Sequence, residues 1–250
     1  MKYTTIVVLE KSQKRGGYCV AGRELFMDGQ APCLGAWKRM VSSDRDSHGA
    51  IFDKHFHISG YNTINVFDVV RVPVITAQTQ PGQPDNILIN ENECWEIEGR
   101  MPASLIASFA DNPANLWWQT GVDSNIVPSA CDDVTHVLQS LYLIKPEKML
   151  FRLTHDYNSF EGYYQRKISV SFEYKGLIYS HLAVTDPKVK RMLRRKFPGP
   201  GSPVIELALL KGDNYFLCVS LSPRFGAAQH HYKLVATVFD FDGYLQEHYH

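Results

Sequence analysis

The sequence predicts an all-β protein that folds as two small β-barrels in tandem, with a few short helices. Three observations lead to this prediction. Residues 168–175 alternate apolar and polar side chains with a period of two, as a strand with one buried face requires. Runs rich in β-branched and aromatic residues recur in both halves of the chain. Helical periodicity is confined to two short segments, and two β modules of about 110–120 residues match the pattern of paired small barrels.

In the N-terminal half, three segments have the composition of strands: 6–9, 18–25 and 66–75. A short loop is expected to follow the second of them and to lead to Trp37. Residues 102–109 are expected to form a short helix. The predicted N-terminal module therefore consists of strands with little helix.

In the C-terminal half, residues 168–175 run into a tight turn at Lys175-Gly176, and residues 177–184 return as the second strand of a hairpin. Residues 216–221 and 232–239 complete this second β cluster. The last of these segments is apolar at nearly every position, as expected of a strand that is buried on both faces.

A helix is predicted at 187–197, directly after the hairpin. Asp186 precedes it as N-cap, and Pro187 fits the first helical position. Val189, Met192 and Leu193 fall on one face, and the Pro-Gly run at 198–201 ends the helix.

Residues 110–135 are rich in Asp, Asn, Pro and Ser, which is typical of a linker. We place the boundary there, with an N-terminal module over 1–120 and a C-terminal module over 130–245.

The chain has 26 basic and 26 acidic residues among its 250, so its overall charge gives no sign of a polyanion partner. Any such site must be a local patch. The five cysteines are scattered without a C-x-x-C pair, which argues against a disulfide framework and a zinc ribbon. With no signal sequence or membrane-length apolar run in the sequence, we expect a cytoplasmic protein with no membrane contact.

The first candidate ligand site surrounds Trp37. An indole can stack on a base, and the neighbouring cations and hydroxyls can meet phosphate. Its predicted members are Arg23, Trp37, Lys38, Arg39, Ser42, Ser43 and Arg45. In the alternative interpretation, Trp37 caps a barrel end and the cations point into solvent.

Trp117 is a second candidate. If the Trp117-Trp118 pair is extended, its two rings point to opposite faces, so that one can stack on a ligand while the other packs. We assign ligand contact to Trp117. The alternative is that the pair fills space between the two modules.

The predicted helix carries the densest basic patch. Six cations occupy nine residues with no acid among them, on the side away from the apolar face. Of these six, Lys190, Arg191, Arg194 and Arg195 are the predicted phosphate contacts. The alternative is an ordinary solvated helix face, although such faces usually mix charges of both signs.

Chemistry beyond binding has little support. The Asp and His residues between Asp44 and His57 could bind a metal for hydrolysis, or form only a polar loop. The phosphate-loop, dinucleotide and hydrolase-elbow motifs lack their minimal residues. We predict neither a catalytic residue nor a metal or other cofactor.

Several short motifs, in order, resemble the dual OB-containing domain family, which is found in bacteria, often near genes of phage-conflict systems. In the first half these are Gly22-Arg23, the segment 37–42, Asp68-Val69-Val70, and a turn at 83–86 that ends on Asn86. In the second half they are 174–176, 184–187, 219–221 and 232–236. Met40 stands where the family usually has Pro. The resemblance implies two OB-like small β-barrels in tandem and a ligand-binding role, and it adds Asn86 to the candidate ligand residues.

The function predicted from the sequence is non-enzymatic binding of nucleic acid or a nucleotide-like ligand. The protein would act as a sensor or targeting subunit, in bacterial antiviral defence, with a partner effector protein. The alternatives are a metal-dependent hydrolase or nuclease that uses the Asp44–His57 loop, and a protein-interaction adaptor.

Overall fold

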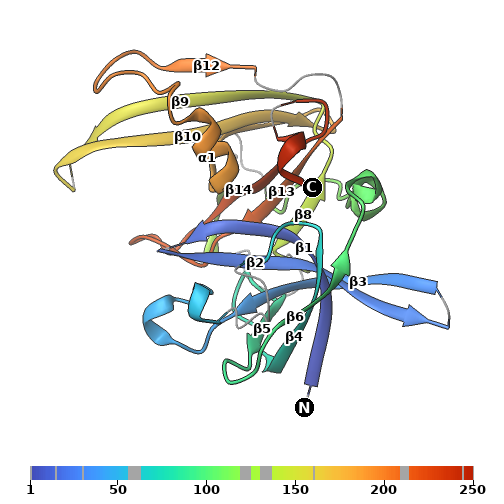
Figure 1. Cartoon of the computed structure of the whole chain (residues 1–250). Helices are drawn as coiled ribbons and strands as arrows, with labels where there is room; N and C mark the ends of the chain where they lie inside the picture. The colour runs from blue at the N-terminus through green and yellow to red at the C-terminus, as the bar shows by residue number, and fades with distance from the viewer. Residues whose placement is uncertain are drawn as a thin grey trace. The chain divides into compact units, whose positions relative to one another are not determined.

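The computed structural model describes residues 2–14, 16–29, 31–55, 63–118, 125–129, 137–159, 161–208, 214–243 and 245–249. They form two compact units (Figure 1). Unit 1 comprises residues 1–111, 132–141 and Tyr249, and unit 2 comprises residues 112–131, 142–248 and His250. The protein is all-β with few helices, as predicted.

The described residues of unit 1 form six strands. They are β1 (Lys2–Lys14), β2 (Gly17–Asp28), β3 (Ala31–Val41), β4 (Asp68–Ala77), β5 (Asn86–Ile89) and β6 (Glu96–Arg100). The strand order is β1-β2-β3-β5-β4-β6, and β1 also pairs with β4. The first five strands therefore close into a barrel with the order 1-2-3-5-4-1, in which β3 and β5 run parallel.

The core of unit 1 is built from the inward positions of these strands. Ile6, Val8, Val20 and Val70 are fully buried, together with Trp95. Gly22 lies where a Cβ atom would come within 2.0 Å of the carbonyl oxygen of Val7. The Gly22-Arg23 motif therefore has a packing reason for its glycine, because β2 approaches β1 too closely there for any side chain.

Two elements of unit 1 differ from the prediction. The segment that holds Trp37 is the strand β3, paired along β2 from Asp28 to Val20, and not a loop. Pairing with both β2 and β5 compensates for its poor strand composition, which includes Gly35, Lys38 and Arg39. The predicted helix at 102–109 is the 3₁₀ helix η3 (Ala103–Phe109). Shorter 3₁₀ turns, η1 (Arg45–Ser47) and η2 (Asp53–His55), interrupt the connection from β3 to β4.

In the part of unit 2 that the structure describes there are eight strands and one α-helix. They are β7 (Ile126–Val127), β8 (Leu141–Ile144), β9 (Lys148–Asn158), β10 (Tyr163–Tyr174), β11 (Leu177–Val184), α1 (Pro187–Leu193), β12 (Ile205–Leu207), β13 (Tyr215–Leu221) and β14 (His231–Asp240). The sheet order is β12-β9-β10-β11-β14-β13-β8, with β11 and β14 parallel. Its five central strands repeat the order 1-2-3-5-4 of unit 1, and α1 lies between the third and fourth of them in the chain.

Two local predictions for unit 2, the turn of its hairpin and the start of its helix, are confirmed. Lys175 and Gly176 both have positive φ at the β10–β11 turn, as a two-residue hairpin turn requires. The Asp186 side chain accepts a hydrogen bond from the Lys188 backbone N–H and caps α1. The helix itself ends at Leu193 rather than at 197, because residues 194–196 form a turn ahead of Pro198.

The linker does not separate the units at a single point. The chain enters unit 2 after Asp111, and residues 132–141 belong again to unit 1. Among the described residues, no helix is long and apolar enough to cross a membrane.

Candidate functional site

A groove of about 460 Å³ lies on the outer face of the β9–β10–β11 sheet in unit 2. Arg152 and Thr154 on β9 stand opposite Ser169 and Lys167 on β10, and Ser169 stands opposite Ala183 on β11. Side chains two residues apart share a face of a strand, so this register places these side chains on one surface. The alternate positions, such as Phe151, Leu153, Ile168, Val170 and Leu182, are buried in the core.

His181 is held on this surface by an irregular backbone. The β10–β11 register shifts between Val170 and Phe172, and His181 has a φ of 56° in the strand opposite. Its N–H donates to the Ser171 hydroxyl over 3.0 Å. Bulges of this kind re-aim a side chain, and non-glycine residues rarely adopt a positive φ. The result is a contact of 3.4 Å between His181 Nε2 and Arg152 Nη1.

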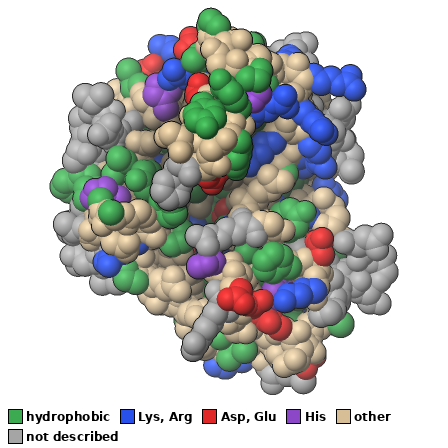
Figure 2. Space-filling view, turned by 90° about the vertical axis from the view of Figure 1, so that its left-hand side faces the viewer, with side chains coloured by type: hydrophobic (Ala, Val, Ile, Leu, Met, Phe, Trp, Pro, Cys, Tyr) green, Lys and Arg blue, Asp and Glu red, His purple; other side chains and the backbone are tan. Residues whose placement is uncertain are grey.

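The groove is strongly basic. Its lining includes the cations Arg152, Arg166, Lys167 and Lys190, whereas its acidic residue is Asp156. Arg152 Nε is buried and makes no hydrogen bond within the described part of the chain. Figure 2 shows Lys and Arg side chains gathered in the upper right of the view.

Lys190 links the groove to the basic helix. Burial lowers the pKa of Lys190, and the nearby Asp186 carboxylate partly opposes this shift. Asp186 is itself buried, and it accepts hydrogen bonds from the backbone N–H groups of Lys188 and Val238. This fixes α1 against β14 and sets the position of Lys190.

The other predicted cations of the segment 187–197 point to solvent. Arg191, Arg194 and Arg195 are exposed, and none of them is in an ion pair with another described residue. Of the four basic-helix residues predicted to contact phosphate, the structure places Lys190 in the groove and the other three outside its lining.

In unit 1, Trp37 is buried, with only 2% of its surface exposed. Its indole N–H donates to Asp111 Oδ2 over 2.9 Å, and Arg23 Nη1 meets Oδ1 of the same carboxylate at 3.0 Å. Arg23 Nε also donates to the carbonyl oxygen of Gly35. The structure does bring Arg23 and Trp37 together, but around an internal carboxylate. Trp37 therefore does not offer the open stacking face that the prediction required.

Arg39 and Asn86 are also buried. Arg39 Nη2 donates to the Ser140 carbonyl oxygen, while the Ser140 N–H and hydroxyl both donate to Asp85 Oδ2 over 2.6 Å. Burial raises the pKa of Asp85, and the Ser140 hydrogen bonds and Arg39 partly oppose that shift. Asn86 Nδ2 donates to Gln83 Oε1. These contacts fasten the returning segment that contains Ser140 to the barrel of unit 1.

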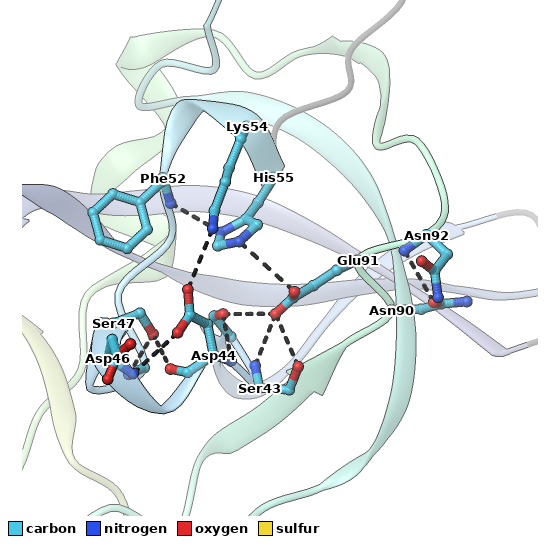
Figure 3. A network of polar contacts seen from close by, with 12 residues as sticks. Ser43, Asp44, Asp46, Ser47, Phe52, Lys54, His55, Asn90, Glu91 and Asn92 are labelled. Atoms are coloured by element: carbon cyan, nitrogen blue, oxygen red, sulfur yellow. Dashed lines mark hydrogen bonds and ion pairs between the residues drawn. The ribbon is translucent and has the colours of Figure 1, made fainter.

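The polar residues after β3 form a network around Glu91 (Figure 3). Glu91 Oε1 accepts from the Ser42 hydroxyl over 2.6 Å and from the Ser43 N–H over 2.8 Å. Burial alone would raise the pKa of Glu91, but these serine hydrogen bonds outweigh it and lower the pKa. His55 Nε2 lies 3.7 Å from Glu91 Oε2, and its Nδ1 accepts from the Phe52 N–H. Ser42 and Ser43 therefore donate hydrogen bonds to a carboxylate of the same unit.

Two predicted members of the site around Trp37 remain to be placed, Lys38 and Arg45. Lys38 Nζ lies 3.4 Å from Glu24 Oε2, so this cation too has an acidic neighbour. The side chain of Arg45 lies outside the described residues, and so does His57. Among the described residues, no group of three or more His, Cys, Asp or Glu side chains could hold a metal ion. Asp44, in the predicted metal loop, instead pairs with Lys54.

The tryptophan pair of the linker is arranged opposite to the assignment. Trp117 is buried and has a φ of 59°. The centroid of its ring lies 5.0 Å from that of the Tyr142 ring. Trp118, in contrast, is 41% exposed. The pair does not lie on a strand, so the argument from alternating faces did not apply.

Three residues of the groove were not predicted from the sequence: Arg152, Lys167 and His181. A signal was present for Arg152, because polar Arg152, Thr154 and Asp156 alternate with apolar neighbours, as in a half-buried strand. No local signal exists for His181, since its position depends on a bulge between two paired strands.

The two units share the strand order 1-2-3-5-4. The match of a family model agrees with the class of protein that this strand order indicates. The model of the dual OB-containing domain matches residues 4–238, and the chain belongs to that family. No curated protein and no solved structure matched the chain. The family implies a binding role for its OB folds, and the particular ligand has to be argued from the side chains.

Proposed function

We propose that unit 2 binds nucleic acid or a nucleotide-like polyanion in the groove on β9, β10 and β11. The observation that carries this proposal is the composition of the groove, whose described lining has four cations and one carboxylate. Such a cluster of cations neutralises the phosphates of a nucleic acid. The counterions that were condensed on these phosphates are then released, which favours binding.

The position of the groove supports the same ligand class. OB folds bind oligonucleotides on the face of their second and third strands. In unit 2 these strands are β10 and β11, which supply Lys167, Ser169 and His181 to the groove. Binding alone is proposed. A role as a sensor or targeting subunit in antiviral defence, together with an effector protein, stays a prediction.

The test is a double substitution, Arg152→Gln with Lys167→Gln, in a titration of a labelled oligonucleotide at several salt concentrations. The matched control is Arg71→Gln with Lys54→Gln, which removes the same charges from the exposed surface of unit 1. We expect the groove variant to weaken binding at least about 10-fold. Its slope of log affinity against log salt should be flatter by about 1.4–1.8, that is, 0.7–0.9 per lost phosphate contact. Equal effects of the two variants would contradict the proposal.

A triple substitution of Arg191, Arg194 and Arg195 to Gln measures how far the polyanion extends beyond Lys190. A further flattening of the salt slope would mean that the ligand continues over α1 and the turn that follows it. An unchanged slope would limit the site to the groove and make the helix a solvated face.

A further inference from the structure

We propose that the ligand of unit 2 is single-stranded nucleic acid, whose unpaired bases stack on tyrosines at the end of the β9–β10 hairpin. This inference rests on the proposed function, because the phosphates of the same strand would lie in the basic groove. The tyrosines are Tyr157, Tyr163 and Tyr164, which are 57%, 53% and 47% exposed.

Tyr163 continues the groove surface along β10. It lies four residues before Lys167, on the same face of the strand, which places the two Cα atoms about 13 Å apart. Its cross-strand partner is Asn158, and its hydroxyl is hydrogen-bonded to the Glu161 side chain. That contact engages the edge of the ring at its hydroxyl, while more than half of the side chain stays open to solvent.

Tyr157 and Tyr164 form a second platform on the other face of the hairpin. They are direct cross-strand partners, with ring centroids 5.3 Å apart and planes at 67°. Tyr164 also packs edge-on against His155, whose Nδ1 lies 3.1 Å from the carbonyl oxygen of Pro198. These contacts hold the rings in place before a ligand arrives, which reduces the entropy lost on binding.

The side chains between the tyrosines and the cations also suit bases better than phosphates. Asp156 and Gln165 are cross-strand partners that lie between Tyr163 and Lys167 on the groove face. A carboxylate repels phosphate but accepts hydrogen bonds from the amino groups of bases. The face therefore divides into an aromatic and acidic part for bases and a basic part, with Lys167 and Arg152, for phosphates.

This division selects against a duplex. In a double helix the bases are already stacked and paired, so the tyrosines cannot reach their faces, although the groove can still meet the phosphates. Base–aromatic stacking contributes to binding of single strands with little dependence on sequence. We therefore expect a preference for single strands that the cations alone would not produce.

The experiment measures fluorescence anisotropy of the full chain with four labelled probes of equal length. They are a mixed-sequence DNA single strand, the same sequence as RNA, its DNA duplex, and an abasic DNA strand that keeps the phosphates. We expect a single strand, DNA or RNA, to bind at least about 10-fold more tightly than the duplex and the abasic strand. The stronger of the DNA and RNA arms then identifies the sugar.

Variants assign this preference to the rings. Tyr163→Leu should weaken single-strand binding about 5- to 150-fold, the equivalent of 1–3 kcal/mol per stacked base. Tyr163→Phe keeps the ring and should keep the affinity, which guards against a general loss of structure. Ile178→Ala is the matched control, because Ile178 is 65% exposed on the same sheet face, at the opposite end of β10 and β11.

Two results would overturn the inference while the proposed function stands. One is equal affinity for duplex or abasic strand, with binding still lost on substitution of Arg152 and Lys167. The other is full single-strand affinity in the variant Tyr163→Leu combined with Tyr157→Leu and Tyr164→Leu. Failure of all four probes to bind would overturn both the inference and the proposal that the groove binds nucleic acid.

Discussion

The two units share a strand order but close their sheets differently. In unit 1, β1 pairs with both β2 and β4, so the order 1-2-3-5-4-1 returns to its starting strand. In unit 2, the strand that corresponds to β1 is β9, and its outer neighbour is β12, while the outer neighbour of β13 is β8. Within the described residues, the sheet of unit 2 is thus extended at both edges rather than closed.

The units also differ in the acidic neighbours of their Lys and Arg side chains. Arg23, Lys38 and Arg39 of unit 1 lie near Asp111, Glu24 and Asp85, respectively. In unit 2, Arg152, Lys167 and Lys190 line one surface, on which the described residues include a single carboxylate. An OB strand order therefore does not by itself make a binding surface, because the side chains decide whether a charge is neutralised inside the unit or is available to a ligand.

The largest expected effect comes from Trp37→Ala, which tests the structural role of unit 1's predicted site. Loss of a buried tryptophan and of its hydrogen bond to Asp111 should lower the free energy of unfolding by about 3–5 kcal/mol, measured by chemical denaturation. Trp118→Ala, at an exposed ring, should cost less than about 1 kcal/mol. A Trp37→Ala protein of unchanged stability but weakened oligonucleotide binding would restore Trp37 as a ligand residue.

The next prediction concerns a buried cation of unit 2. Lys233 is 1% exposed, and its Nζ contacts the Trp118 carbonyl oxygen and the face of the Tyr179 ring. Among the described residues it has no carboxylate partner, and burial lowers its pKa to about 8. The unfolded chain, with its lysine pKa near 10.5, binds more protons between these values. Stability should therefore rise with pH across this window.

The measurement is the free energy of unfolding against pH for the natural chain and for Lys233→Met. Relative to the variant, the natural chain should gain about 3 kcal/mol between pH 8 and 10.5. Burial raises the pKa of Tyr179 in both proteins, so its effect cancels in the difference. Parallel curves would mean that Lys233 is not desolvated.

The smallest expected effect comes from Glu24→Gln, which leaves Lys38 without its acidic neighbour. The pair is partly exposed, so stability should change by no more than about 1 kcal/mol. If internal carboxylates keep unit 1 from binding polyanions, oligonucleotide affinity should rise slightly, by less than about 5-fold. Glu96→Gln, which frees Arg71 in the same way, is the control for overall charge. A fall in affinity would contradict the idea that internal carboxylates keep unit 1 from binding polyanions.

The strands with strong local patterns could be predicted from the sequence. The β10–β11 hairpin follows from its alternation and its Lys175-Gly176 turn, and the start of α1 follows from Asp186 and Pro187. The strand β3 could not, because Gly35, Lys38 and Arg39 are weak strand residues that β2 and β5 hold in place from either side. Periodicity reports burial along one segment and contains no information on which segments pair with it.

In the candidate sites, too, some features could be predicted from the sequence and others depend on the fold. The sequence is enough to show that Lys190 and its neighbours are a basic cluster, since six cations within nine residues need no folding to be close together. The enclosure of Trp37 beside Asp111, 74 residues away in the chain, is known only from the folded protein. The contact of Arg152 with His181 across three strands is likewise known only from the fold. The physical reason is that burial and ion pairing depend on strand register and on a bulge, which are properties of paired strands and not of either strand alone.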